Sequence, residues 1–224
     1  MPELPEVENV KRALKKDILN KRIIKADVYW NNIVAHPDVE SFKKLIANQM
    51  INNILRRGKW LMFELDDYFL LSHLRMEGKY FIRKKDDVRN KHEHVIFLFD
   101  DGIELRYHDT RKFGKMYLIE KERVYLEKPL NELGLEPWDD SLNINYLRSK
   151  LNKKPIKTLL LNQSIITGIG NIYADEILFL SKIHPETLSN RLTNEDLENI
   201  ILYTKKVLEK AIFKGGTTIK SYTS

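Results

Sequence analysis

The first residues of the chain could carry covalent chemistry. The sequence opens with Met1-Pro2-Glu3-Leu4-Pro5-Glu6, and a proline in second place permits removal of the initiator methionine. Pro2 would then carry a free secondary amine, which can attack an electrophilic carbon and form an iminium that serves as an electron sink for elimination. Because α-amino groups titrate near ~8, a modest lowering of the pKa would keep this amine neutral and reactive.

Two glutamates stand close to this amine in the sequence. Glu3 and Glu6 are placed for proton transfer and for orienting the amine. The alternative is that Pro2 and Pro5 only begin a helix, since proline suits the first helical turn. These residues alone leave both interpretations open.

The residues that follow predict the helix that would hold the amine. Val7, Val10, Leu14 and Ile18 recur at steps of three and four, which makes one apolar stripe. Glu6 falls in the first turn, where a carboxylate meets the positive end of the helix dipole.

Residues 22–120 have the pattern of a β-rich domain. Short apolar runs alternate with turn signals such as Asp66-Asp67 and Asp100-Asp101-Gly102. The eight runs are RIIKADVYW, MINNILRR, WLMFEL, YFLLSHLRM, KYFIR, HVIFLF, IELRYHD and KMYLIE. About eight short strands with frequent turns indicate a β-sandwich or flattened barrel.

Helical patterns replace strands in the last third of the chain. Pro129, Gly134 and Pro137 mark residues 129–141 as a linker. Helices are expected at 142–151, 155–162, 171–183 and 193–214, the last with a Thr193 capping box and a stop at Gly215-Gly216. The predicted fold class is α+β, with an N-terminal helix and β-sandwich domain at 1–128 and an all-helical domain at 142–224.

Charge and composition narrow the choice of partner and compartment. Residues 142–224 hold 12 Lys+Arg against 7 Asp+Glu, whereas residues 1–141 hold 26 against 25. A basic helical part suggests a polyanion, although a generally lysine-rich proteome would give the same bias. No run approaches the ~20 apolar residues that span a bilayer and no leader is recognisable, so we expect a cytoplasmic protein without membrane contact. The absence of cysteine excludes disulfides and cysteine-bound zinc.

Eight collinear blocks resemble the formamidopyrimidine-DNA glycosylase family of base-excision repair enzymes. Together they extend over nearly the whole chain, and Leu4 favours this branch over the endonuclease VIII branch, which usually has glycine at that position. The blocks are MPELPEVE at 1–8, RGK at 57–59, HLRMEG at 73–78, YHDTRKFG at 107–114, LGLEP at 133–137, IKTLL at 156–160, GIGNIYADE at 168–176 and GGTT at 215–218.

The resemblance implies a catalytic centre of four residues. Pro2 would attack C1′ of the damaged nucleotide, and Glu3 would act as general acid and base. Glu6 would support the amine and the lesion pocket. Lys59 lies where the family has an essential β-turn lysine, which would pair with a phosphate and keep the amine neutral by charge repulsion. Most lysines of this chain are simply solvated, and only the block match distinguishes Lys59.

The resemblance also implies a wedge that fills the space left by the extruded nucleotide. Met76, Arg111 and Phe113 match it: a flexible thioether, a guanidinium for the orphaned base and an aromatic ring. Taken singly, Met76 and Phe113 would more often be core residues of a β domain.

Further DNA contacts are implied around the helix–two-turns–helix hairpin. Gly170, Asn171 and Lys157 would approach phosphates near a helix amino terminus, and His92 would contact DNA from the β domain. The chain after Gly216 matches the start of the family's lesion loop. The loop residues in this sequence are Thr217, Thr218, Ile219, Lys220 and Tyr222.

The family's last module has no counterpart in this sequence. By the resemblance, relatives continue from the lesion loop into a β-hairpin zinc finger with four cysteines and a DNA-contacting arginine. This sequence has no cysteine and ends at Ser224, so we expect no zinc or other cofactor. Truncation, a split gene and a degenerate relative stay open as explanations.

Three functions therefore remain under consideration. The first is a bifunctional glycosylase and abasic-site lyase for oxidised purines such as 8-oxoguanine and formamidopyrimidines, acting on damaged double-stranded DNA as a monomer. The second is a DNA-binding remnant without catalysis, or with impaired catalysis. The third is an endonuclease VIII-like preference for oxidised pyrimidines, against which Leu4 and the HLRMEG block argue.

Overall fold

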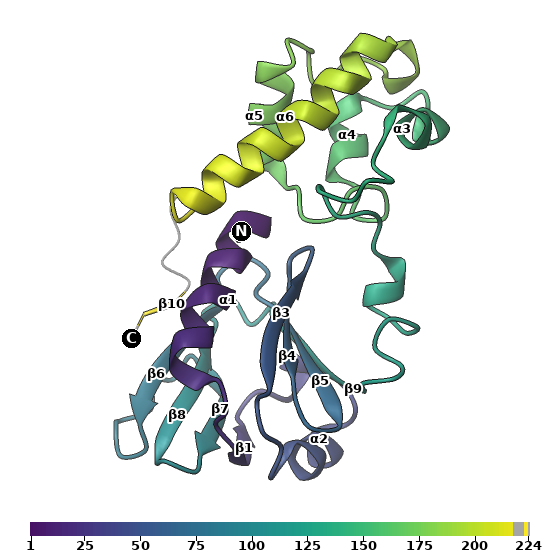
Figure 1. The fold of residues 1–224 in the computed structure, drawn as a ribbon. Coiled ribbons are helices and arrows are strands. Elements are labelled where there is room, and N and C mark those ends of the chain that lie inside the picture. Colours follow the sequence, from purple (N-terminus) through teal and green to yellow (C-terminus); the bar gives the residue numbers. More distant parts are fainter. Residues whose placement is uncertain (217–221, 224) are drawn as a thin grey trace.

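The computed structural model describes residues 1–216 and 222–223. The chain forms a β-sandwich with one long helix against it and a separate helical part beyond it (Figure 1). The α+β fold class predicted from the sequence is confirmed. Within the described residues, no helix is long and apolar enough to cross a membrane.

Helix α1 (Leu4–Ile18) follows the apolar stripe of the sequence. Val7, Val10, Leu14 and Ile18 are all buried, as predicted, and all but Val10 are fully so. Lys15 and Lys16 lie in the last turn, where positive charge stabilises the carboxyl end of a helix.

Two five-stranded sheets make up the sandwich, and all eight predicted strands are present. One sheet has the order β1-β7-β8-β6-β10 and the other the order β2-β9-β5-β4-β3. In chain order the strands of this domain are β1 (Ile23–Val28), β2 (Val34–His36), β3 (Asn53–Arg57), β4 (Trp60–Glu64), β5 (Tyr68–His73), β6 (Lys79–Lys84), β7 (Glu93–Phe99), β8 (Ile103–His108) and β9 (Lys115–Glu120). Neighbouring strands pair antiparallel except where β2 joins β9 and where β10 (Tyr222–Thr223) joins β6.

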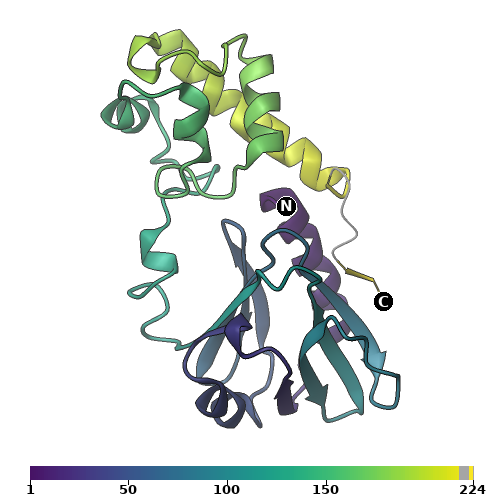
Figure 2. The same ribbon diagram turned by 180° about the vertical axis from the view of Figure 1, so that it is seen from behind.

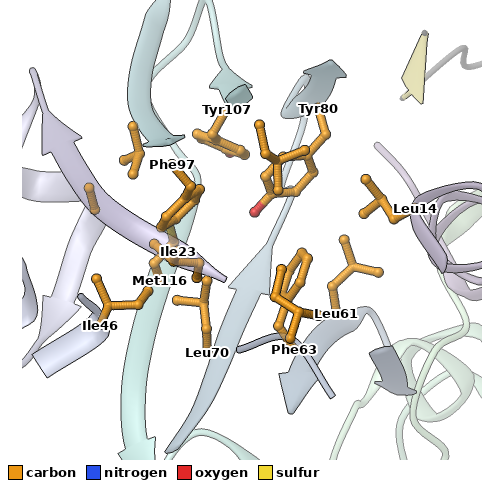
Figure 3. Packing of buried hydrophobic residues seen from close by; sticks show 14 of the residues in the cluster. Leu14, Ile23, Ile46, Leu61, Phe63, Leu70, Tyr80, Phe97, Tyr107 and Met116 are labelled. Carbon is orange, nitrogen blue, oxygen red and sulfur yellow. The ribbon is translucent and has the colours of Figure 1, made fainter. Parts of the chain in front are cut away.

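The sandwich core lies between the two sheets and is closed at one side by α1 (Figure 3). Tyr80 stands between the rings of Phe63 and Tyr107, with centroids 5.8 and 5.3 Å away in edge-on contacts. The buried Tyr80 hydroxyl donates to Ser72 Oγ at 2.7 Å, so this polar tip is satisfied inside the core. Leu14 of α1 packs into the same cluster.

The β-rich expectation for residues 22–120 was wrong for one stretch. Helix α2 (Val39–Ile46) and the short 3₁₀ helix η1 (Asn31–Ile33) interrupt the strands. Asp38 caps α2 by accepting a hydrogen bond from the Ser41 N–H at 3.0 Å, and Phe42 and Ile46 are fully buried. A cap followed by two apolar residues four apart is enough for a helix when a sheet face covers them.

The helical part begins after the linker and has its own core. Its elements are α3 (Ile144–Lys150), α4 (Ile156–Leu161), α5 (Asn171–Leu180) and the long α6 (Asn194–Phe213), with the 3₁₀ turn η3 (Ser189–Arg191) before α6. These four helices correspond to the four that the sequence predicts. The view from behind shows the linker, including η2 (Leu130–Glu132), crossing at the side of the molecule from the sandwich to the helices (Figure 2).

Candidate active site and DNA-binding face

The amino terminus lies where the sandwich meets the helical part (Figure 1). Leu4 is fully buried in the core of the helical part, and its N–H donates to the Gly168 carbonyl at 3.0 Å. Pro2 is buried, whereas Met1 is 38% exposed. While Met1 is attached, the Pro2 nitrogen is an amide, so amine chemistry at Pro2 requires removal of Met1.

The carboxylate of Glu3 lies on the amino-terminal end of α5. Its Oε2 accepts hydrogen bonds from the N–H groups of Gly170 at 2.7 Å and Tyr173 at 3.4 Å, and its Oε1 accepts from Ile172 at 3.0 Å. A helix leaves its first N–H groups unpaired, and the dipole there favours negative charge. Burial nevertheless raises the pKa of Glu3, against the opposing effect of these amides and of Lys59.

Glu6 links the amino terminus to the helical part. Its Oε2 accepts from the Glu3 N–H at 2.9 Å, and its Oε1 accepts from the Tyr173 hydroxyl at 2.6 Å. A Cβ placed on Gly216 would lie 2.8 Å from the same Oε1, so the backbone that leaves α6 passes directly against this carboxylate. Three segments far apart in the sequence therefore meet at Glu6.

Lys59 projects from the two-residue turn between β3 and β4. Arg57 pairs with Trp60 across the hairpin, which leaves Gly58 and Lys59 as the turn. Gly58 has φ +56°, and a positive φ at the first central position, with glycine there, is typical of a tight hairpin turn.

Lys59 lies near enough to Glu3 and Glu6 to interact with their charges. Its side chain is almost fully buried, and this burial lowers the pKa of the ammonium group. The negative charges of Glu3 and Glu6 oppose the shift, and Arg75 adds to it. The structure therefore brings Pro2, Glu3, Glu6 and Lys59 together at one site, as the resemblance implies.

Such a site can support both attack and proton transfer. A carboxyl group with a raised pKa exchanges protons near neutral pH more readily than an ordinary glutamate does. A cation held near the terminal amine lowers the pKa of that amine. The site therefore combines the buried Pro2, a carboxyl group with a raised pKa and a buried lysine.

Sequence reasoning assigned no role to two further residues of the site. Tyr173 is fully buried and donates to Glu6, and His73 accepts from the Arg75 N–H at 3.0 Å through its Nδ1. Burial lowers the pKa of His73 to about 3, and the charges of Arg75 and Lys59 add to this effect, so the ring is a neutral acceptor. Both residues fall within the blocks that matched the family, which was the only signal for them.

The three wedge residues lie on two adjacent loops and face outward. Met76 is 38% and Phe113 49% exposed, so neither is the core residue that its type alone would favour. The guanidinium of Arg111 lies 4.7 Å from the Phe113 ring centroid. Met76, Arg111 and Phe113 are therefore accessible to a partner.

Asp109 gives the second wedge loop its shape. This fully buried carboxylate accepts from the N–H groups of Arg111, Phe113 and Gly114 at 3.0, 2.9 and 2.8 Å. The Tyr107 hydroxyl also donates to it at 3.3 Å. A loop fixed from inside in this way can hold apolar side chains in solvent without collapsing onto the core.

His92 lies near the same loop but in a histidine cluster. Its ring centroid is 5.6 Å from that of His108 and 6.4 Å from that of His94, and its carbonyl accepts from the Asp109 N–H at 3.0 Å. Burial lowers the pKa of both His94 and His108. His92 and His108 are both half-buried, and His94 is buried.

The hairpin before α5 differs in one respect from what the sequence suggested. Asn171 is exposed at the start of the helix, and Lys157 pairs with Asp175 at 2.7 Å. The N–H of Gly170, which we expected to approach a phosphate, instead donates to Glu3. The negative charge at this helix terminus is therefore supplied by the protein itself.

Most of the expected lesion loop lies outside the described residues. Thr217, Thr218, Ile219 and Lys220 belong to that part. The backbone of Tyr222 is described and pairs parallel with Tyr80 of β6.

The chain does not contain the residues of a cysteine-bound zinc site, since the sequence has no cysteine. Across residues 1–216 and 222–223, no three or more histidine or carboxylate side chains are grouped so that they could hold a metal ion. The described residues thus do not fit the zinc that the family resemblance implies.

The chain is similar to known proteins over nearly its whole length. Residues 1–116 match the formamidopyrimidine-DNA glycosylase N-terminal domain, and residues 133–223 match the H2TH domain of the same enzymes. The formamidopyrimidine-DNA glycosylase of Oceanobacillus iheyensis is 48% identical over all of this chain and 81% of its own length. That of Shouchella clausii is 46% identical, with 82% of its length covered.

Solved structures show the same similarity in three dimensions. The Lactococcus lactis enzyme bound non-covalently to DNA with an AP site superposes with a TM-score of 0.92 at 40% identity, over 97% of this chain and 83% of that one. The same enzyme with DNA containing N7-benzyl-Fapy-dG gives 0.92 at 41% identity, over 98% and 82%. With both domain families matched in order and relatives at 46–48% identity over the whole chain, the chain belongs to the formamidopyrimidine-DNA glycosylase family of base-excision repair enzymes.

Proposed function

We propose that the chain, once Met1 is removed, is a bifunctional glycosylase and abasic-site lyase that acts on oxidised purines in double-stranded DNA. The observation that carries the proposal is the convergence of Glu3, Glu6 and the buried Lys59 on the amino terminus. The relatives at 46–48% identity carry the name formamidopyrimidine-DNA glycosylase, which supports 8-oxoguanine and formamidopyrimidine lesions as substrates.

In the first step the Pro2 nitrogen attacks C1′ of the damaged nucleotide. A C–N bond forms while the bond from C1′ to the base breaks, and the opened sugar leaves an iminium on Pro2. The Pro2 nitrogen loses its proton, the departing base gains one, and the C1′–O4′ bond breaks with protonation of O4′ to complete the iminium. The iminium then acidifies the neighbouring sugar C–H groups, and removal of these protons lets the 3′ and 5′ phosphates leave in successive β- and δ-eliminations.

Glu3 supplies and takes up the protons in this scheme. Its raised pKa favours the protonated carboxyl group more than in an ordinary glutamate, and the amides of α5 stabilise the charged form when the proton has gone. One group can therefore act first as acid and then as base.

Lys59 keeps the nucleophile neutral. A buried ammonium near the amino terminus disfavours a second positive charge on Pro2. The same cation can pair with the phosphate beside the lesion when DNA enters.

The exposed wedge and the helical part provide the DNA contacts. Phe113, Met76 and Arg111 replace the extruded nucleotide, and Asn171 and Lys157 contact phosphates without reading sequence. Every role in this chemistry belongs to a side chain or to the terminal amine, so we expect no cofactor. We expect the protein to act as a monomer in the cytoplasm, on nucleoid DNA.

Borohydride trapping on a duplex with one abasic site tests the proposal. The chain should form a covalent adduct, and Pro2→Gly should lower its yield strongly, because a primary amine replaces the constrained secondary one. Pro5→Ala is the matched control, since it changes the neighbouring proline without touching the amine. Intact mass confirms that Met1 has been removed.

Each alternative predicts a different result. No adduct from protein of confirmed N-terminus would leave a DNA-binding remnant, whose binding should be weak and steeply salt-dependent. Faster excision of oxidised pyrimidines than of 8-oxoguanine in competition would indicate the endonuclease VIII preference.

A further inference from the structure

Two of the sequence blocks that resemble the family contribute only one residue, Lys59, to the proposed chemistry. They are RGK at 57–59 and LGLEP at 133–137, some 75 residues apart in the sequence. The structure brings them into contact at the base of the turn that carries Lys59. What joins them is the carboxylate of Glu136.

Glu136 receives hydrogen bonds from three neighbouring residues of the hairpin. Its Oε1 accepts from the Gly58 N–H at 2.6 Å and from Arg57 at 3.2 Å. Arg56 makes a bidentate contact, to Oε2 at 2.8 Å and to Oε1 at 3.2 Å. A bidentate arginine–carboxylate pair fixes the orientation of the two groups as well as their distance.

Gly58 is held on all sides by this arrangement. Its N–H is bound by Glu136, and its carbonyl accepts from Arg56 Nη1 at 2.9 Å. Its α-carbon faces Thr167, since a Cβ at this position would lie 2.1 Å from Thr167 Oγ1. Both peptide groups that lead into Lys59 are thus constrained.

Glu136 itself is anchored to the helical part. Its neighbour Leu135 donates to the Ile165 carbonyl at 3.1 Å and accepts from the Thr167 N–H at 2.9 Å. Thr167 is followed directly by Gly168, whose carbonyl accepts from the Leu4 N–H, and two residues later comes Gly170, whose N–H donates to Glu3. The carboxylate therefore ties the Lys59 turn to the segment that also holds the amino terminus.

We propose that Glu136 is a positioning residue for Lys59: its carboxylate, oriented by Arg56 and Arg57, sets the place of the Gly58–Lys59 turn relative to Pro2 and Glu3. Glu136 does not touch the reacting atoms. This role rests on the proposed function, in which Lys59 must stand near the Pro2 amine and the lesion phosphate.

The charge of Glu136 matters as well as its shape. Arg56 also pairs with Glu8 of α1 at 3.2 Å, but Glu8 pairs with Lys11 and Arg12 as well, so cations outnumber carboxylates in this cluster. Glu136→Ala removes every contact to the turn. Glu136→Gln keeps an oxygen that can accept from the Gly58 N–H but loses the bidentate ion pair with Arg56. It should therefore retain part of the function that Glu136→Ala loses.

The test compares Glu136→Ala and Glu136→Gln with wild type and with Glu132→Ala. Glu132 is the matched control, because it lies in the same linker and forms an ion pair with Lys128 but makes none of these contacts to the turn. Three quantities are measured: the single-turnover rate of borohydride trapping at saturating protein, the Kd for the abasic duplex, and amide hydrogen exchange of the peptide that covers residues 55–62.

For Glu136→Ala we expect trapping to slow by about 10- to 100-fold, as small misplacements of catalytic groups do. The Kd should rise by far less than the rate falls, because no DNA-facing residue is removed and only the contact of Lys59 with the lesion phosphate is weakened. Protection from exchange should fall in the turn, with Glu136→Gln intermediate and Glu132→Ala unchanged. Trapping within about twofold of wild type, or a loss of rate matched by an equal loss of affinity, would overturn the proposal.

Failure of the proposed function is distinguishable from failure of this inference. If wild type forms no adduct, the proposed chemistry fails, and hydrogen exchange alone decides the role of Glu136. Loss of protection confined to the turn in Glu136→Ala would support positioning of Lys59, whereas unchanged or uniformly reduced protection would refute it.

Discussion

Replacement of Gly170 by alanine should separate catalysis from DNA binding. A Cβ at this position would lie 2.4 Å from Cδ and 2.5 Å from Oε1 of Glu3. Gly170 has φ −126°, an ordinary extended value, so alanine adds no backbone strain there. The effect of the change is therefore confined to the carboxylate of Glu3.

The expected magnitude follows from the contact distance. Ordinary carbon contacts begin near 3.4 Å, so the Glu3 carboxyl group must move by about 1 Å from its seat on α5. A misplacement of that size costs about 100-fold in rate, which corresponds to about 2.7 kcal/mol in the activation free energy. The hydrogen bond from Gly170 to Glu3, 2.7 Å long here, should lengthen or break.

Single-turnover trapping on an abasic duplex measures this loss, and titration at fixed salt measures the Kd, which should change by less than about threefold. Gly102→Ala is the matched control. It lies in a distant turn at φ +80° with no atom near the added Cβ, so it introduces strain without touching the site. Trapping by Gly170→Ala at the rate of the control would refute the idea that the hydrogen-bonded position of the Glu3 carboxylate at the start of α5 matters for catalysis.

Two further predictions concern Lys59 and the wedge. Because burial lowers the pKa of Lys59, its charge is lost as the pH rises through a value below 10.5, and trapping should decline there. In Lys59→Arg, which stays charged, the decline should move to higher pH, and an unmoved decline would exclude Lys59 as its source. Phe113→Ala should weaken binding to the abasic duplex by about 1–3 kcal/mol through lost base contact. Its thermal stability should hardly change, since the ring is half exposed, and a large fall in melting temperature would contradict a wedge role.

The elements of the fold could largely be predicted from periodicity. The stripe from Val7 to Ile18 and the eight apolar runs each have one dominant repeat, and each became the expected helix or strand. Helix α2 was missed because eight residues between strands carry too few repeats to outweigh a β-rich surrounding. Its capping residue Asp38, next to Pro37, was the available signal.

The site could be predicted only as far as the family blocks extend. Glu3 and Gly170 are 167 positions apart, and no local pattern shows that a carboxylate will occupy a helix terminus so distant in sequence. The contacts of Asp109 and Glu136 could not be predicted for the same reason: both bind backbone N–H groups, which every residue but proline has. Such contacts depend on tertiary packing, so the types of the residues involved do not reveal them.

The site exists only while the two halves of the molecule are docked, because each half lacks part of it. Lys59 comes from the sandwich, the amides that hold Glu3 come from α5, and Leu4 packs in the core of the helical part although α1 otherwise belongs to the sandwich. Proteins open locally at lower free energy than they unfold globally. Opening at this junction would remove Leu4 from the helical core and separate the Gly58 turn from Glu136. Glu3, Lys59 and the amino terminus would then lose their relative positions in a single event. Catalysis should therefore fail at a temperature or denaturant concentration below that at which either core melts. The interdomain contacts, more than the stability of either core, should set the range of conditions in which the enzyme works.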